Sequence, residues 1–182
     1  MAHWARPPSS GRAHHEGGPG EGGRVAETQE RRGQIAEGLE TSLERVRALG
    51  DGLVAGAERP LLRGEWRVRD ALSHLAARSN PVALARQRIA EQGQERTLTV
   101  DEINHGQVEE RSDLTVQGLV DEIVSGLEAA RSELDHLSDE FLEQTVKVSF
   151  GPGEMAAGAI VLFGGPRHFL EHLGDIEEAL RA

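Results

Sequence analysis

The sequence predicts an all-α protein built as a four-helix bundle, with a disordered N-terminal extension ahead of it. Three observations lead to this prediction. Apolar residues recur every three or four positions in four long segments, which is the spacing of one helix face. Tyr is absent and the 182 residues contain only two Trp and four Phe, so the core must be built from aliphatic side chains. Residues 1–27 are rich in Gly, Pro, Ser and His without a periodic apolar pattern, which is typical of a disordered segment.

The chain therefore divides into a disordered tail, residues 1–27, and one helical domain, residues 28–182, which is long enough for a single core. The first helix is expected from about Glu27 to Leu53, with Glu and Arg between its apolar positions. The second begins near Val68 and continues towards Glu91. Pro81 should kink or interrupt it, because proline removes one backbone donor and clashes with the preceding turn.

The middle of the chain predicts a short helix and then a long one. The short helix lies between Thr99 and Ser112, with Thr99 or Asp101 as its cap. The long helix runs from near Thr115 to near Leu137 and has the cleanest apolar stripe in the chain. After it, Gln144–Phe150 alternates enough to form a short extended piece.

The C-terminal part is expected to hold the fourth long helix. Met155–Phe163 is apolar on nearly all sides, so this stretch is either buried or faces a partner. We expect the Gly164-Gly165-Pro166 sequence to break or re-aim the chain. Pro166 then fits the first position of the last helix, Pro166–Ala182, where its missing donor has no consequence.

Composition limits the classes of partner. Acidic residues outnumber basic ones by 31 to 20, a net charge of −11, which argues against a nucleic-acid partner or an anionic membrane surface. Cysteine is absent, so thiol chemistry would need a thiol supplied by a small molecule. The N-terminus lacks the apolar region of a secretory signal, and the longest apolar run is far short of the roughly 20 residues that cross a bilayer. We therefore expect a cytoplasmic protein with no membrane partner.

The expected last helix carries two histidines, His168 and His172, beside its apolar stripe. Four residues of spacing place the imidazoles one above the other, roughly 6 Å apart at Cβ, so the pair can chelate one metal ion. His74, at the edge of the apolar face of the second helix, is the natural third nitrogen. Asp70 and Asp175 are the carboxylates expected to orient the rings from behind.

A structural alternative exists for each of these histidines. His168 and His172 can simply be polar residues that flank a core stripe, and a histidine at the edge of a core, such as His74, is usually a hydrogen-bonded structural residue. His105 is expected to face solvent. The sequence contains no Gly-rich phosphate loop after a strand, no Gly-x-Ser-x-Gly elbow and no zinc-knuckle spacing.

Three pieces of the sequence resemble a known family in their order and spacing. They are Gly64–Ala76 (GEWRVRDALSHLA), Glu102–Asn104 ahead of Glu109–Arg111, and Arg167–Ile176 (RHFLEHLGDI). Together they resemble the DinB-like superfamily, in particular the metal-binding domain of mycothiol-dependent maleylpyruvate isomerases. The resemblance covers the chain from about residue 28 to its end.

This resemblance implies a four-helix bundle that binds a divalent metal ion, zinc or nickel. The ligands would be one histidine of the second helix and two residues spaced four apart on the last helix, here His74, His168 and His172. The isomerases have Glu at the position of His168, so this chain is closer to the members that have three histidines.

The leading functional hypothesis is a metal-dependent enzyme that acts on a small electrophilic molecule. The resemblance implies a transferase or isomerase that uses mycothiol as co-substrate, and metal-activated hydrolysis is the neighbouring hypothesis. One alternative is a bundle that binds or sequesters a small ligand without turnover. Another is a self-associating helical protein without a site, in which Met155–Phe163 forms the face of a homodimer.

Overall fold

The structure is a computed structural model that describes residues 21–92, 98–148 and 153–182. Its helices are α1 (Glu21–Ala55), α2 (Val68–Ala76), α3 (Pro81–Ala90), α4 (Val100–Glu109), α5 (Val116–Leu134), α6 (Asp139–Glu143), α7 (Ala157–Leu162) and α8 (His168–Arg181). A π-helical turn, η1 (Phe163–Arg167), joins α7 to α8. Two short strands, β1 (Thr145–Lys147) and β2 (Glu154–Ala156), pair antiparallel.

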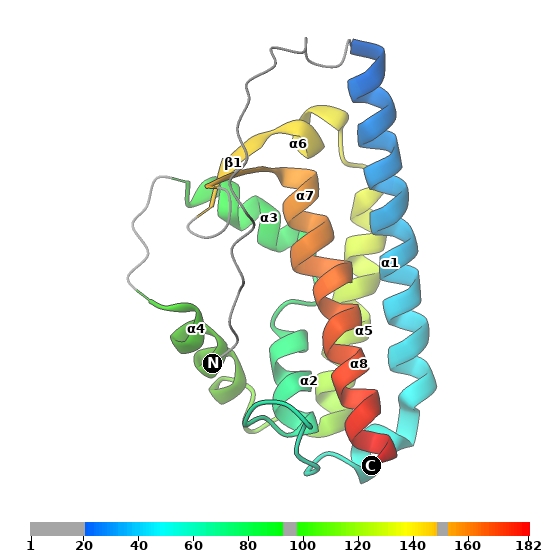
Figure 1. The fold of residues 1–182 in the computed structure, drawn as a ribbon, viewed down its shortest axis with the longest axis vertical. Helices are drawn as coiled ribbons and strands as arrows, with labels where there is room; N and C mark the ends of the chain where they lie inside the picture. The colour runs from blue at the N-terminus through cyan, green and yellow to red at the C-terminus, as the bar shows by residue number, and fades with distance from the viewer. Residues whose placement is uncertain (1–20, 93–97, 149–152) are drawn as a thin grey trace, which may run out of the picture.

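The helices form the predicted four-helix bundle (Figure 1). Over one half of its length α1 packs on α5, α5 on α2, α2 on α8, and α8 on α1. Over the other half α3 takes the place of α2 and α7 takes the place of α8. The helix α4 packs on α2 outside this ring, and α6 lies near the strands at one end.

The predicted apolar stripes make the core. Fully buried side chains recur at helical spacing on α1, α5 and α8, and the largest of them is Phe169 of α8. The buried apolar positions of these three helices are Ile35, Leu39, Leu43, Val46, Leu53, Leu119, Ile123, Leu127, Ala130, Leu134, Phe169, Leu173, Ile176 and Ala179. Periodicity predicts these helices well because each presents a single face to one common core.

The second predicted helix is interrupted at proline, as expected. Helix α2 ends at Ala76 and α3 begins at Pro81, whose missing N–H is not needed at a helix start. The side chain of Asn80 caps α3 by accepting the backbone N–H of Ala83 at 2.9 Å. This interruption lets one segment supply two helices to the two halves of the bundle.

The start of the first helix differs from the prediction. Helix α1 begins at Glu21, six residues before the expected start at Glu27. Residues 1–20 of the expected disordered tail lie outside the described residues. The helix kinks near its end at Gly50, whose φ of 41° lies in the left-handed region that favours glycine.

The chain changes direction at Gly164–Pro166, as expected, but Pro166 is not the first residue of the last helix. Helices α7 and α8 follow one another through η1 with a kink at Gly165, and Pro166 lies inside the turn instead of at the start of the last helix (Figure 1). A π-helical turn can accommodate a residue without a backbone donor. Gly165 packs directly on Pro81, so a Cβ placed on it would lie 2.6 Å from the Cβ of that proline.

The apolar stretch Met155–Phe163 supplies β2 and α7, not a continuous outer face. Ala157, Val161 and Leu162 are buried in the chain's own core, whereas Phe163 is 47% exposed. The bundle therefore uses most of the residues that the homodimer alternative required.

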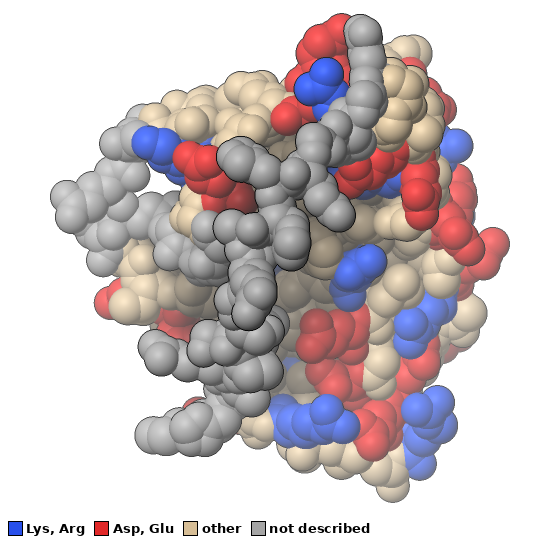
Figure 2. Space-filling view, turned by 45° about the horizontal axis from the view of Figure 1, so that its top comes forward, with Lys and Arg blue, Asp and Glu red and all other residues tan. Residues whose placement is uncertain are grey.

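Acidic and basic side chains are mixed on the face shown in Figure 2. Ion pairs such as Arg47 with Glu128 and Arg131 with Glu40 join α1 to α5 at the surface. Among the described residues, no helix is both long and apolar enough to span a bilayer.

Candidate metal centre

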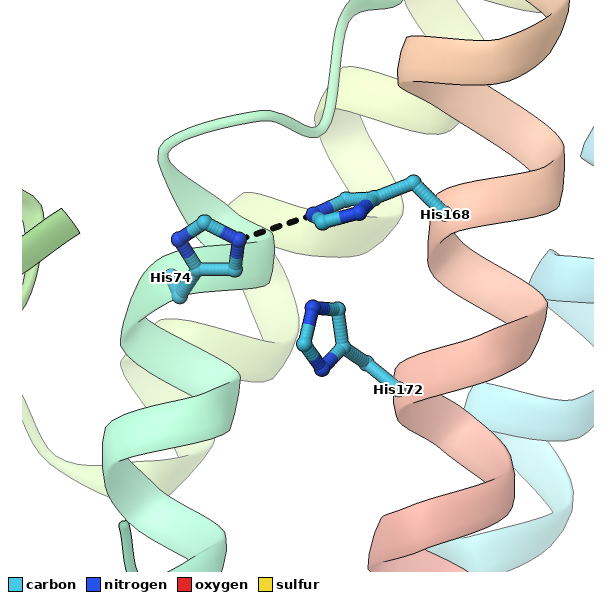
Figure 3. Close-up of side chains that lie close together, drawn as sticks. All are labelled: His74, His168 and His172. Carbon is cyan, nitrogen blue, oxygen red and sulfur yellow. Dashed lines mark hydrogen bonds between the residues drawn. The ribbon is translucent and has the colours of Figure 1, made fainter. Parts of the chain in front are cut away.

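The three predicted histidines lie together inside the bundle (Figure 3). His74 comes from α2, and His168 and His172 come from successive turns of α8. One ring nitrogen from each of the three lies within 4.8 Å of the others. His74 is 2% exposed and the other two are partly buried. Two segments about 94 residues apart in sequence thus meet at one point.

The nitrogen positions fit a metal ion. In a tetrahedral site with Zn–N distances of about 2.0–2.1 Å, two ligand nitrogens lie roughly 3.3 Å apart. The Nε2 atoms of His74 and His168 are 2.8 Å apart, and the complete set lies within 4.8 Å. Adjustments on the order of 1 Å therefore suffice to bring three nitrogens around one ion. Imidazole nitrogens suit both zinc and nickel.

The protonation states also fit. Burial lowers the pKa of His74 to about 4, with further lowering from His172 and Arg78. Burial also lowers the pKa of His168 to about 2, and it lowers the pKa of His172 against the opposing charges of Asp175 and Glu171. The imidazoles are therefore neutral at pH 7, which is the form that binds metal.

Gln107 of α4 holds the ring of His74. Its Oε1 lies 2.9 Å from His74 Nδ1, so that nitrogen donates its proton to the amide oxygen and the lone pair of Nε2 points into the cluster. The sequence prediction missed this residue. The only signal was that Gln107 follows the Glu102–Asn104 piece of the family pattern on the same helix. His105, on that helix, is exposed as expected.

Asp70 does not have the orienting role that was expected of it. Its carboxylate accepts the backbone N–H of Arg67 at 2.9 Å and also two guanidinium N–H groups of Arg67. Asp70 thus closes the N-terminus of α2, because an acceptor at the third helical position satisfies a free backbone donor. It also compensates for the lack of a capping side chain at Arg67.

Asp175 affects His172 by its charge alone. It raises the pKa of His172, yet His172 Nδ1 is buried with no hydrogen-bond partner among the described residues. A hydrogen bond from His172 Nδ1–H to the carboxylate of Asp175, as an orienting role would require, is therefore absent among the described residues. Trp66 covers the rings from one side, with its own ring 5.1 Å from that of His74 and 6.1 Å from that of His172, centre to centre.

A cavity of about 250 Å³ opens beside His168. Its wall includes Arg78, just beyond the end of α2, together with apolar side chains of α3, β2, α7 and η1. The sequence did not single out this arginine. A substrate in the cavity would lie next to the histidine cluster.

No family model and no curated protein sequence matches this chain. Solved structures do. The colibactin self-resistance protein ClbS, in complex with a double-stranded DNA, is 12% identical with a TM-score of 0.63, covering 85% of this chain and 96% of that one. YfiT from Bacillus subtilis, described as a probable metal-dependent hydrolase with an unusual four-helix bundle topology, is 15% identical with a TM-score of 0.61, covering 94% and 93%. An uncharacterized protein from Clostridium difficile 630 is 10% identical with a TM-score of 0.61, covering 83% and 94%.

These comparisons correct one expectation and support another. The exclusion of a nucleic-acid partner, drawn from the net charge of −11, is wrong as a rule for this fold, because ClbS is in complex with DNA. A total charge says nothing about where individual basic side chains gather. This chain shares the fold of ClbS and YfiT, and the four-helix bundle that YfiT is described as having is the architecture expected from the sequence.

Proposed function

We propose that this protein is a divalent-metal-dependent enzyme that activates a small nucleophile for attack on a small electrophilic molecule. The observation that carries this proposal is the convergence of His74, His168 and His172, with all three pKa values held below their usual range by burial. One buried and two partly buried neutral imidazoles have no evident structural purpose as a group. Perturbed titratable residues beside a cavity are typical of functional sites.

The three histidines would hold a zinc or nickel ion. Because the imidazoles are neutral, they leave the ion's charge uncompensated and, with three protein ligands, a position free for another group. A divalent ion bound there supplies Lewis-acid chemistry that lowers the pKa of water or of a thiol. Gln107 fixes the orientation of His74, and Trp66 covers the rings on one side.

Water and a low-molecular-weight thiol are the two candidate nucleophiles. The description of YfiT as a probable metal-dependent hydrolase favours water. The motif resemblance to mycothiol-dependent isomerases favours mycothiol, and a protein without cysteine would need such an external thiol. We favour metal-assisted hydrolysis, with thiol transfer or isomerisation as the second candidate.

Metal analysis tests the first part of the proposal. Protein purified without an affinity tag should carry about one divalent ion per chain after dialysis. His74→Ala and His172→Ala should each remove it, whereas His105→Ala, at an exposed site, should retain it. His14 and His15 lie outside the described residues and can bind metal on their own, so the comparison of variants in the full chain cancels their contribution. Equal metal content in all four proteins would refute the site.

Turnover assays separate the nucleophiles. The zinc-loaded protein is incubated with a panel of esters, amides and other electrophiles, with and without mycothiol. Product formation without thiol that is lost in His172→Ala supports hydrolysis, and thiol consumption that depends on His172 supports transfer. Saturable binding with no turnover would replace both with the sequestering alternative.

Double-stranded DNA belongs in the same tests, because ClbS is a DNA complex. Retarded migration of a short duplex, abolished by salt, would add a nucleic-acid ligand to the function of this protein. If the duplex is not retarded even at low salt, DNA binding is a property of ClbS that this protein does not share.

A further inference from the structure

Arg78 is a cation placed beside the histidine cluster without a counter-charge. Its Nε is buried and has no hydrogen-bond partner in the described parts of the chain. No described carboxylate pairs with it, whereas many other arginines here, such as Arg32, Arg45 and Arg111, pair with Asp or Glu. Burial lowers the pKa of Arg78, which reflects the same loss of solvation.

A purely structural role does not account for this placement. An arginine just after a helix end often donates to the last carbonyls of that helix. The guanidinium of Arg78 makes no such bond among the described residues, although its backbone N–H bonds to the carbonyl of Leu75. Burying a charged group without a partner is costly, so such a group normally meets an anion in its working state.

The position of Arg78 defines where that anion would lie. Arg78 and His168 line the same cavity, and the charge of Arg78 lowers the pKa of each of the three histidines. The guanidinium is thus within electrostatic reach of the whole cluster. An anion that bound to it would place the rest of its molecule next to the histidines.

The rest of the cavity wall is mainly apolar. Leu84 of α3, Met155 of β2, and Ile160 and Phe163 of α7 and η1 contribute to it. Arg88 adds a second positive charge to the wall. At about 250 Å³ the cavity is smaller than most ligand sites, so it suits a compact molecule.

We propose that the substrate of this site is a small carboxylate with an apolar body, whose carboxylate is bound by the guanidinium of Arg78 while the apolar part occupies the cavity beside His168. This inference rests on the proposed function, since it names the substrate class of the same site. A guanidinium and a carboxylate match in shape and form paired charge-assisted hydrogen bonds. The apolar wall excludes water and strengthens that pair.

The test compares 3-phenylpropanoate with its neutral amide, 3-phenylpropanamide. Binding is measured by calorimetry on the full chain in metal-free and zinc-loaded forms. The acid should bind at least about tenfold more tightly than the amide, since a charge-assisted bond is replaced by a neutral one. Arg78→Gln should reduce this preference to less than about twofold, and Arg78→Lys should retain part of it. Arg63→Gln removes an exposed arginine outside the cavity and should keep the wild-type preference.

A second measurement needs no variant. In the wild-type protein the Arg78 Nε–H resonance should shift on addition of the acid and not on addition of the amide. A preference for the acid that survives Arg78→Gln, the absence of any preference in wild type, or an unshifted Nε–H resonance would overturn the inference.

Metal content separates this inference from the proposed function. Arg78→Gln should lose the preference for the acid while it keeps about one zinc ion per chain. If the wild-type protein binds no metal but its metal-free form still prefers the acid over the amide in an Arg78-dependent way, the metal enzyme is refuted and an anion-binding cavity remains. Intact metal binding without the preference would refute the substrate class alone.

Discussion

The Nε2 atoms of His74 and His168 face each other at 2.8 Å, which is hydrogen-bonding distance between two groups of the same kind. Because His74 Nδ1–H donates a hydrogen bond to Gln107 Oε1, the neutral ring carries no proton on Nε2. The proton between the two rings therefore belongs to His168. A metal ion bound at this point would replace that proton, so metal binding and protonation would compete for the same nitrogens.

The first prediction concerns the stability of the metal-free protein in mild acid. Each histidine of the cluster has a lower pKa in the folded protein than the usual 6.5, so below that pH the unfolded chain binds more protons. The free energy of unfolding should therefore fall as the pH decreases from about 6.5 towards 4, by at most about 1.4 kcal/mol per pH unit for each histidine. Urea unfolding between pH 7.5 and 5 measures this slope.

Two variants assign the slope to the cluster. His168→Gln removes one of the buried imidazoles and should flatten the dependence, while His136→Gln, at an exposed position, should keep the wild-type curve. Identical slopes in all three proteins would mean that the cluster does not titrate as described.

The second prediction concerns Gln107. Gln107→Leu keeps the size of the side chain but removes the acceptor for His74 Nδ1–H, so the ring loses its fixed orientation. Metal affinity should fall about ten- to a hundredfold, and Gln107→Glu should restore most of it. Competition with a chromophoric chelator measures the affinity. Gln117→Leu, an exposed site on α5, is the control and should bind metal like wild type; an unchanged affinity in Gln107→Leu would contradict the assigned role.

The third prediction separates Asp70 from the metal centre. Asp70→Ala removes the acceptor that closes the start of α2 and should cost about 0.5–2 kcal/mol in the free energy of unfolding. Its metal affinity should stay within about threefold of wild type, far from the loss expected for an orienting residue. Urea unfolding and chelator competition on the same preparation give both quantities. A large loss of metal affinity without loss of stability would show that Asp70 orients a histidine ring of the metal centre, as the sequence first suggested.

The fourth prediction concerns the turn that carries α7 into α8. In Gly165→Ala the new Cβ would lie 2.6 Å from Pro81, so one of the two segments must move. The free energy of unfolding should fall by roughly 1–3 kcal/mol, as in other overpacked sites. Gly174→Ala on α8 meets no atom within 4 Å and should be neutral or stabilising, because alanine favours a helix interior. Thermal unfolding of the pair measures the difference; equal stabilities would show that the close contact is absent.

The bundle could be predicted from the sequence because each long helix repeats one apolar face. The stripe from Ile35 to Leu53 and the one from Phe169 to Ile176 are both buried. The turn at η1 could not be predicted in this way. Gly164-Gly165-Pro166 signals a change of direction, but the form that this change takes, a π-helical turn that packs on Pro81, involves a segment distant in the chain.

The site was predictable for the histidines and not for their surroundings. The spacing of His168 and His172 and the position of His74 in a family motif identified the cluster. Gln107 could not be found because its role depends on how α4 docks on α2, which no local pattern encodes. Arg78 is one of 20 basic residues, and only the structure shows that it lacks a carboxylate among its described neighbours.

X-ray absorption spectroscopy of the zinc-loaded, tag-free protein tests the central claim most directly. Three imidazoles on one ion should give nitrogen scatterers at about 2.0–2.1 Å with the outer-shell pattern of three histidine rings, and this pattern should be lost in His74→Ala, which should not retain the ion. A spectrum with fewer than three imidazoles in the wild-type protein, or one that His74→Ala leaves unchanged, would contradict the account.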